Sequence, residues 1–155
     1  MPDVRIEPAV GDAMLEQWRY VHNVIIPADE LSLDAVRERS TRNRLENAYV
    51  GDVLVGCSTV RPPQDGAATV IARVLPAHRR QGLGTALYEN GLAHARVLGA
   101  TVIETCVLAV NEDGLRFAEK QGFVEVERYA LPGETDLWVD LRLGPGPGLG
   151  PDRAV

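Results

Sequence analysis

Two arginines and two glycines stand close together in the segment Arg79-Arg80-Gln81-Gly82-Leu83-Gly84-Thr85. Glycines at this spacing leave backbone amides bare, and bare amides at a tight turn form a concave site for an anion. The segment lies between a β-branched run and a helical pattern, so the positive end of a helix dipole adds to the charges of Arg79 and Arg80. We therefore predict a turn that binds a diphosphate.

Two common phosphate-binding patterns are excluded by the residues that follow Gly82. A P-loop requires Gly-Lys-Ser/Thr, and a dinucleotide-binding turn requires a third glycine with an acidic residue about 20 positions later. Neither pattern is present. Because a lone Gly-x-Gly often only relieves crowding between a strand and a helix, the interpretation depends on the elements around it.

Apolar periodicity and turn residues predict an α/β fold, with about four helices and a mixed sheet of about seven strands. Asp12 is expected to cap a first helix through Tyr20 or beyond, and Ser32 a second helix through Arg42. Further helices are expected over residues 82–98 and 111–120. Six of the strands are placed over residues 48–50, 53–60, 68–74, 101–110, 123–130 and 137–143, with a loop over residues 61–66.

Length and composition indicate one globular domain. The chain has 155 residues, of which 45% are hydrophobic and 25% charged, enough to bury one core. We expect this domain to span residues 1–143. Residues 144–155 are rich in glycine and proline and are expected to form a disordered tail.

The two-glycine turn resembles the first signature of the GNAT superfamily of N-acetyltransferases. The match is Arg79-x-x-Gly82-x-Gly84 after Val74-Leu75-Pro76. The second signature of that superfamily is matched by Asn111, Gly114, Phe117 and Gly122-Phe123. The resemblance covers residues 4–143, and it implies the GNAT fold with acetyl-CoA as co-substrate.

The resemblance also implies where the cofactor binds. Amides of residues 79–85 would bind the pyrophosphate, Val74 and Leu75 would hydrogen-bond the pantetheine arm like an added strand, and Asn111 would contact the same arm. The full set of cofactor-binding residues that it implies is Val74, Leu75, Arg79, Arg80, Gln81, Gly82, Leu83, Gly84, Thr85, Asn111, Gly114 and Phe117.

Acetyl transfer to an amine requires a base for the amine and a proton for the departing thiolate. Many members of the superfamily carry a tyrosine seven positions after the asparagine, but Ala118 stands there. Either another group protonates the thiolate, or the thiolate leaves with the help of solvent. We consider Glu104 and His22 as catalytic candidates.

Each candidate has a structural alternative. Glu104 is a carboxylate inside an apolar strand, where it serves either as the base or as the partner of Arg73 in an ion pair. His22 lies on the first helix and either takes the proton of the amine through water or is a polar surface group. Cys106 is expected to be a buried thiol, so no covalent acetyl-cysteine is proposed.

Charge and cysteine content narrow the partners. The formal net charge is −6 and the basic residues are scattered along the sequence, which argues against nucleic acid as a binding partner. Cys57 and Cys106 lack the spacing of a metal site or a disulfide framework, so no metal is expected. Residues 1–10 lack the basic start and apolar core that a signal peptide needs, and the sequence has no apolar run of about 18 residues, so we expect a cytoplasmic protein that does not contact membranes. Asp29 and Glu30 are candidate attractors of a cationic amine.

Two functions follow from these observations. The first is an acetyl-CoA-dependent N-acetyltransferase that transfers acetyl directly to a primary amine of an unidentified small molecule or peptide. The alternative is a catalytically weak module that binds acyl-CoA as a sensor, which the replacement at Ala118 favours. Either a monomer or a homodimer is compatible with the sequence.

Overall fold

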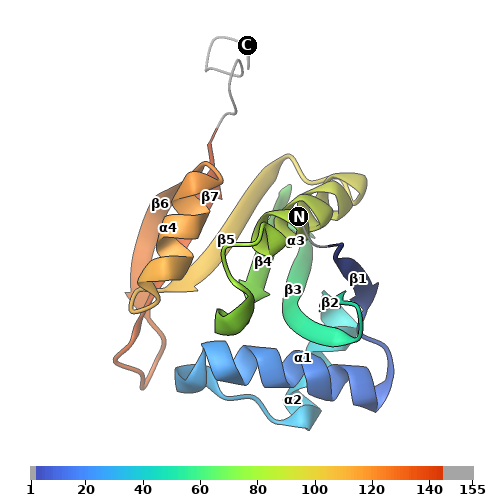
Figure 1. Cartoon of the computed structure of the whole chain (residues 1–155). Coiled ribbons are helices and arrows are strands. Elements are labelled where there is room, and N and C mark those ends of the chain that lie inside the picture. Colours follow the sequence, from blue (N-terminus) through green and yellow to red (C-terminus); the bar gives the residue numbers. More distant parts are fainter. Residues whose placement is uncertain (1–2, 145–155) are drawn as a thin grey trace. The chain divides into compact units, whose positions relative to one another are not determined.

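The computed structural model describes residues 3–144, which contain seven β-strands and four α-helices. They form two compact units, which divide between Thr101 and Val102. The first unit holds strands β1 to β4 with helices α1 to α3, and the second holds β5 to β7 with α4 (Figure 1).

The sheet of the first unit consists of β1 (Arg5–Pro8), β2 (Arg44–Val50), β3 (Val53–Gln64) and β4 (Ala67–Val74). Each strand pairs antiparallel with the next. The strands expected over residues 48–50 and 53–60 are present but longer, and they form a hairpin whose turn residue Gly51 has a φ of +60°. Strand β1 was not predicted, because four residues are too few to show an alternating pattern.

The predicted loop over residues 61–66 is wrong in its first part, because β3 continues to Gln64. The pairing with β4 is irregular between Arg61 and Gln64. The two prolines lie in this irregular stretch, where a missing N–H does not cost a ladder hydrogen bond. The turn itself is Asp65-Gly66, and both residues have positive φ, 52° and 83°.

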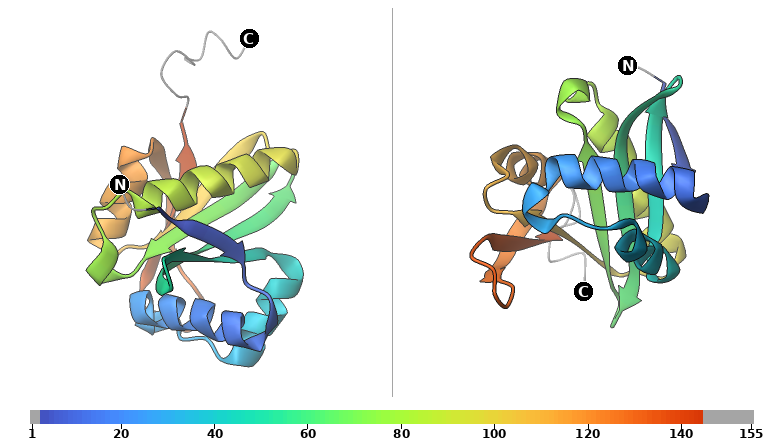
Figure 2. Two further views of the ribbon diagram at one scale, coloured as in Figure 1. Left: turned by 45° about the vertical axis from the view of Figure 1, so that its right-hand side comes forward. Right: turned by 90° about the horizontal axis from the view of Figure 1, so that it is seen from below.

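Two helices, α1 (Gly11–Ile25) and α2 (Leu33–Arg42), lie on one side of this sheet, and α3 (Leu83–Val97) lies on the other (Figure 2). The core between the sheet and the first two helices is apolar and contains Leu15, Trp18, Val21, Leu31, Val36, Leu45 and Cys57. The core beneath α3 contains Ala48, Val55, Leu83 and Leu87.

The two predicted helix caps have different outcomes. Ser32 caps α2 as expected, since its Oγ accepts a hydrogen bond of 3.1 Å from the amide of Ala35. Asp12 does not cap α1, because α1 begins after Val10 without a side-chain cap. The carboxylate of Asp12 instead accepts two hydrogen bonds from Arg37 of α2, of 3.0 and 2.6 Å. A charged partner brought close by the tertiary fold has displaced the local interaction.

Helix α3 approaches β4 closely at Gly91. A Cβ added to Gly91 would lie 2.5 Å from Cγ1 of Val70. We expect Gly91→Ala to lower the free energy of unfolding by about 1–3 kcal/mol, because the site is already filled. Chemical denaturation measures this loss. The double variant Gly91→Ala/Val70→Ala should lose less than the sum of the two single losses, and strict additivity would contradict the clash.

The second unit contains β5 (Val102–Leu108), α4 (Glu112–Lys120), β6 (Phe123–Ala130) and β7 (Leu137–Leu143). β7 pairs antiparallel with β5 and with β6. The strand expected over residues 101–110 is shorter than predicted, and its burial alternates, with Glu104 and Cys106 only half-buried. The tail expected over residues 144–155 lies, except for Gly144, outside the described residues.

Candidate functional site

The turn before α3 has the backbone that an anion site requires. Gly82, the residue before the helix, has a φ of +79°, and no side chain caps the first turn. Arg80 also has a positive φ, of 64°, a conformation that is uncommon for a residue with a side chain. The first amides of α3 therefore lack the side-chain oxygen that most helices use as a cap. The arrangement can bind an anion through backbone N–H groups and the helix dipole.

The end of β4 presents one peptide edge that is directed away from β3. The amide of Leu75 donates to the carbonyl oxygen of Val55 on β3 at 2.8 Å. In an antiparallel ladder the neighbouring residue has its peptide groups on the opposite edge, so those of Val74 point away from β3. The carbonyl oxygen of Val74 accepts a hydrogen bond of 3.0 Å from Nε of Arg79. Val74 thus has the backbone orientation of a strand edge, whereas the amide of Leu75 is already paired with β3 and its side chain packs against the core.

The second signature lies in the second unit, where it builds the start of α4. Oδ1 of Asn111 caps the helix by accepting from the amide of Gly114 at 3.0 Å. A Cβ on Gly114 would lie 2.5 Å from Nδ2 of Asn111 and 3.0 Å from Cγ1 of Val107. Glycine is therefore required at position 114 by the cap. Phe117 is half-buried, and Ala118, at the position of the usual tyrosine, is buried.

Glu104 is held by a cross-strand partner within the second unit. It lies opposite Arg142 of β7, which donates to its Oε2 from Nη2 at 2.8 Å and from Nε at 3.2 Å. The Glu104 side chain is 30% exposed. An ion pair that is reached by solvent leaves the carboxylate accessible to a proton donor.

His22 is buried, so the expectation of a polar surface group is wrong for this residue. Its side chain is 2% exposed, and its ring stacks on Trp18 with centroids 5.4 Å apart. Nε2 donates to the carbonyl oxygen of Asp29 at 2.9 Å, while the buried Nδ1 has no partner among the described residues. Burial, followed by the positive charge of Arg73, lowers the pKa of His22 to about 4. At neutral pH the imidazole is therefore uncharged.

Asp29, one of the two acidic residues in the loop after α1, has a structural role. Its carboxylate lies 3.6 Å from Nε2 of His22 and 3.8 Å from Nη2 of Arg39. Glu30 is exposed. Asp29 therefore links α1 and α2 through its carboxylate. The charge of this carboxylate is then less available to attract an incoming amine.

The two thiols have different surroundings. Cys57 lies in the core of the first unit, where burial raises its pKa to about 12. A thiol with that pKa is not a nucleophile at neutral pH. Cys106 was expected to be buried but is only half-buried.

Sequence reasoning missed a phenol–carboxylate pair in the second unit. Tyr129 of β6 donates to Oδ1 of Asp140 on β7 at 2.9 Å. The signal was available in part, because Asp140 interrupts the apolar run of its strand in the same way as Glu104. The partner of Asp140 was not predictable, since it depends on the β6–β7 register.

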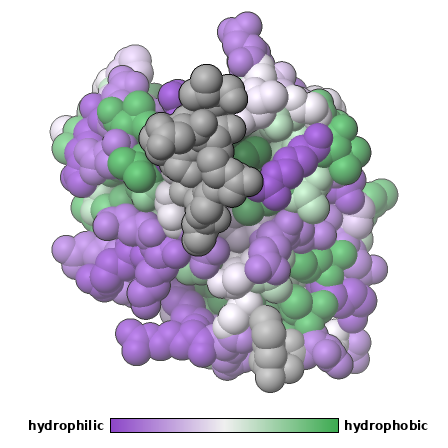
Figure 3. Space-filling model, turned by 90° about the horizontal axis from the view of Figure 1, so that it is seen from above, coloured by the Kyte–Doolittle hydropathy of each residue, from purple (hydrophilic) through white to green (hydrophobic). Residues whose placement is uncertain are grey.

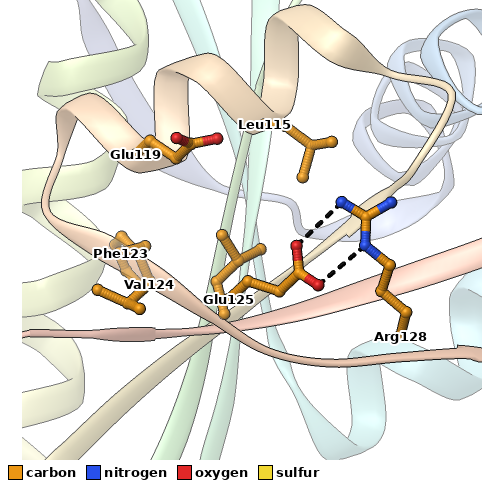
Figure 4. A pocket seen from close by; sticks show the side chains of 7 residues that line it. Leu115, Glu119, Phe123, Val124, Glu125 and Arg128 are labelled. Atoms are coloured by element: carbon orange, nitrogen blue, oxygen red, sulfur yellow. Dashed lines mark hydrogen bonds and ion pairs between the residues drawn. The ribbon is translucent and has the colours of Figure 1, made fainter.

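A separate hollow of about 340 Å³ lies between α4 and β6 (Figure 4). Its wall is partly apolar, and an ion pair of 2.9 Å between Glu125 and Arg128 crosses it. The lining residues are Leu115, Glu119, Phe123, Val124, Glu125, Arg128 and Leu141. None of the predicted site residues is among them.

Within residues 3–144, no group of three or more His, Cys, Asp or Glu side chains could hold a metal ion. Over the same residues, no helix combines the length and the apolar character needed to cross a membrane. The surface seen in Figure 3 mixes small hydrophilic and hydrophobic areas.

Comparison with known proteins gives a family and a fold. The sequence profile of the family "Acetyltransferase (GNAT) family" matches residues 10–123. No curated protein sequence matches the chain. Many solved structures do, at low sequence identity.

Three of these structures illustrate the similarity. Ard1 from Thermoplasma volcanium has a TM-score of 0.77 at 16% identity, covering 90% of this chain and 95% of its own. The ribosomal-protein-S18-alanine N-acetyltransferase from Escherichia coli has a TM-score of 0.72 at 18% identity, covering 91% and 93%. YncA from Salmonella typhimurium, a putative acetyltransferase solved with its cofactor acetyl-CoA, has a TM-score of 0.70 at 15% identity, covering 91% and 93%.

The chain belongs to the acetyltransferase (GNAT) family. The expected GNAT fold, with seven strands and four α-helices, is confirmed. The expected class of enzyme, a GNAT-type N-acetyltransferase, is confirmed with it.

Proposed function

We propose that this enzyme transfers an acetyl group from acetyl-CoA directly to a primary amine of a small molecule or peptide. The observation that carries the proposal is the uncapped start of α3, where Arg80 and Gly82 have the left-handed backbone of an anion-binding turn. Backbone amides, the helix dipole and two arginines offer a diphosphate the complementary charge.

The residues at this turn fit coenzyme A. The amides at the start of α3 would hold the pyrophosphate, and the outward peptide edge of Val74 would hydrogen-bond the pantetheine amides. Arg79, which now donates to the Val74 carbonyl, would give up that hydrogen bond and turn to the phosphates. The bound cofactor supplies an activated thioester. Asn111, Gly114 and Phe117 remain candidates for contacts to the arm.

Of the two catalytic candidates, Glu104 is the one that solvent and an acceptor can reach, because its side chain is 30% exposed and that of His22 only 2%. An imidazole with a pKa of about 4 takes a proton from an ammonium group poorly. The unpartnered Nδ1 of His22 can instead accept a hydrogen bond. Cys57 does not serve as an acetyl carrier, because its buried thiol is not ionised at neutral pH.

Two variants that break the same ion pair test the role of Glu104. We expect Glu104→Gln to lower kcat by at least about tenfold, because loss of a general base costs a factor of this order or more. Arg142→Gln, which removes the partner and leaves the carboxylate, should retain most of kcat. Steady-state release of coenzyme A measures both. Equal losses in the two variants would show that the pair is only structural.

The competing function is a module that binds acyl-CoA without efficient transfer. It is favoured by Ala118, a buried methyl group where many family members carry a phenol. Thermal unfolding with acetyl-CoA, followed by a thiol-release assay with a panel of primary amines, tests both functions. Stabilisation with turnover supports the enzyme, and stabilisation without turnover of any amine supports the binding module. Absence of stabilisation would overturn both.

A further inference from the structure

One face of the second unit's sheet carries a row of polar side chains. The β5–β7 register pairs Cys106 with Asp140 and Leu108 with Trp138, and the β6–β7 register pairs Tyr129 with Trp138. Residues directly opposite each other, and residues two apart on a strand, share a face. Glu104 and Arg142 continue this row, which we call the Asp140 face.

Helix α4 packs on the other face. Residues of α4 line the hollow together with Phe123 and Leu141, and Gly114 approaches Val107. Val107 and Leu141 alternate with Cys106 and Asp140 along their strands. Within the second unit, no described helix covers the Asp140 face.

Trp138 has a hydrogen-bond donor on this face that the described residues leave unused. Its side chain is 7% exposed, and the buried Nε1–H has no partner there. The other tryptophan, Trp18, donates to the carbonyl oxygen of Ser58 at 3.1 Å. A buried donor without a partner costs free energy and calls for an acceptor atom.

Asp140 offers the complementary group two residues away. Tyr129 donates to one carboxylate oxygen at 2.9 Å, and a carboxylate can accept about four hydrogen bonds. Burial and the contact with Asp140 raise the pKa of Tyr129. The phenol therefore keeps its proton at neutral pH and holds the carboxylate in place.

Because Trp138 and Asp140 stand two apart on β7, their Cα atoms are about 7 Å apart on the same face. One aminoacyl unit, with an amine and a carbonyl oxygen on adjacent carbons, can span such a pair through two hydrogen bonds of about 2.9 Å. A simple alkylamine would satisfy Asp140 but leave the indole N–H unpaired.

We propose that the Asp140 face binds the acceptor, with Asp140 accepting from the amine and Trp138 Nε1–H donating to a neighbouring carbonyl oxygen. The acceptor class is then an α-aminoacyl compound, either an amino-acid amide or the N-terminus of a peptide. Tyr129 is a positioning residue. The inference rests on the proposed acetyl transfer and names its substrate class.

The two tryptophans make a direct test possible, since the chain gives only two indole N–H signals. The ¹⁵N-labelled full chain, with coenzyme A present so that no transfer occurs, is titrated with alaninamide, with trialanine, or with sec-butylamine, which lacks the carbonyl. Trp138→Phe assigns the signals. We expect alaninamide or trialanine to move the Trp138 signal and sec-butylamine not to, with Trp18 unmoved. Tighter binding of alaninamide indicates a small amide as the acceptor, and tighter binding of trialanine indicates a peptide.

Variants separate this inference from the proposed function. Asp140→Asn should weaken alaninamide binding by about tenfold, Tyr129→Phe by less, and the exposed control Asp113→Asn not at all. All three should keep the stabilisation by acetyl-CoA. If acetyl-CoA stabilises the protein but saturating alaninamide and trialanine leave the Trp138 signal unmoved, or move Trp18 equally, the acceptor assignment is overturned and the acetyl-CoA site stands. If acetyl-CoA gives no stabilisation, the proposed function fails.

Discussion

Gly82→Val is expected to abolish the stabilisation that acetyl-CoA gives the protein. A ligand at 100 times its dissociation constant contributes about 2.7 kcal/mol, a shift of several degrees in Tm. Gly82 has a φ of +79°, which a β-branched residue adopts only as a strained outlier. The variant should therefore rebuild the turn and lose the amide orientation, with at least about a 100-fold rise in the dissociation constant for acetyl-CoA. Thermal unfolding with and without the cofactor measures this.

A second glycine in the same unit provides the matched control. Gly99 follows α3 with a φ of +94°, and nothing lies within 4 Å of an added Cβ. Gly99→Val should cost a similar amount of stability, of the order of 1–2 kcal/mol, and keep the full acetyl-CoA response. If Gly82→Val also keeps the response, the turn before α3 does not bind the cofactor.

The stability of the protein should decrease by about 3 kcal/mol as the pH falls from 6.5 to 4 because of His22 alone. Burial lowers the pKa of its imidazole from 6.5 to about 4, so in this window the unfolded chain binds a proton that the folded chain does not. The contribution of neutral His22 is complete above pH 6.5 and is lost as the pH falls through this window. Urea denaturation at half-unit pH steps gives the free energy of unfolding.

The comparison with His22→Gln isolates this effect. Arginine partners lower the pKa values of several carboxylates, such as Asp12, Glu38 and Glu125. Protonation of these groups in acid also lowers the free energy of unfolding, but it does so equally in the native protein and in the variant. The difference between the two pH profiles should therefore flatten below pH 4. A native profile parallel to that of His22→Gln between pH 6.5 and 4 would contradict the buried neutral imidazole.

Local sequence patterns were sufficient for most of the fold. The helix over residues 33–42, the hairpin at Gly51 and the helix that begins after Asn111 follow from caps and turn residues that act within a few positions. The turn before α3 was also predictable, because its glycines and the preceding strand are adjacent in the chain. Strand β1 was missed, since its four residues form a strand through pairing with β2, about 40 residues later.

The sequence by itself therefore determined the family, the order of most elements and the glycine turn before α3, all of which depend on short-range spacing. Only the tertiary structure decided the partners of the charged and aromatic side chains. It placed Asp12 with Arg37, buried His22 against Trp18, and joined Tyr129 to Asp140. These contacts depend on strand register and helix packing, and a shift of one residue in register turns every side chain of a strand to the opposite face.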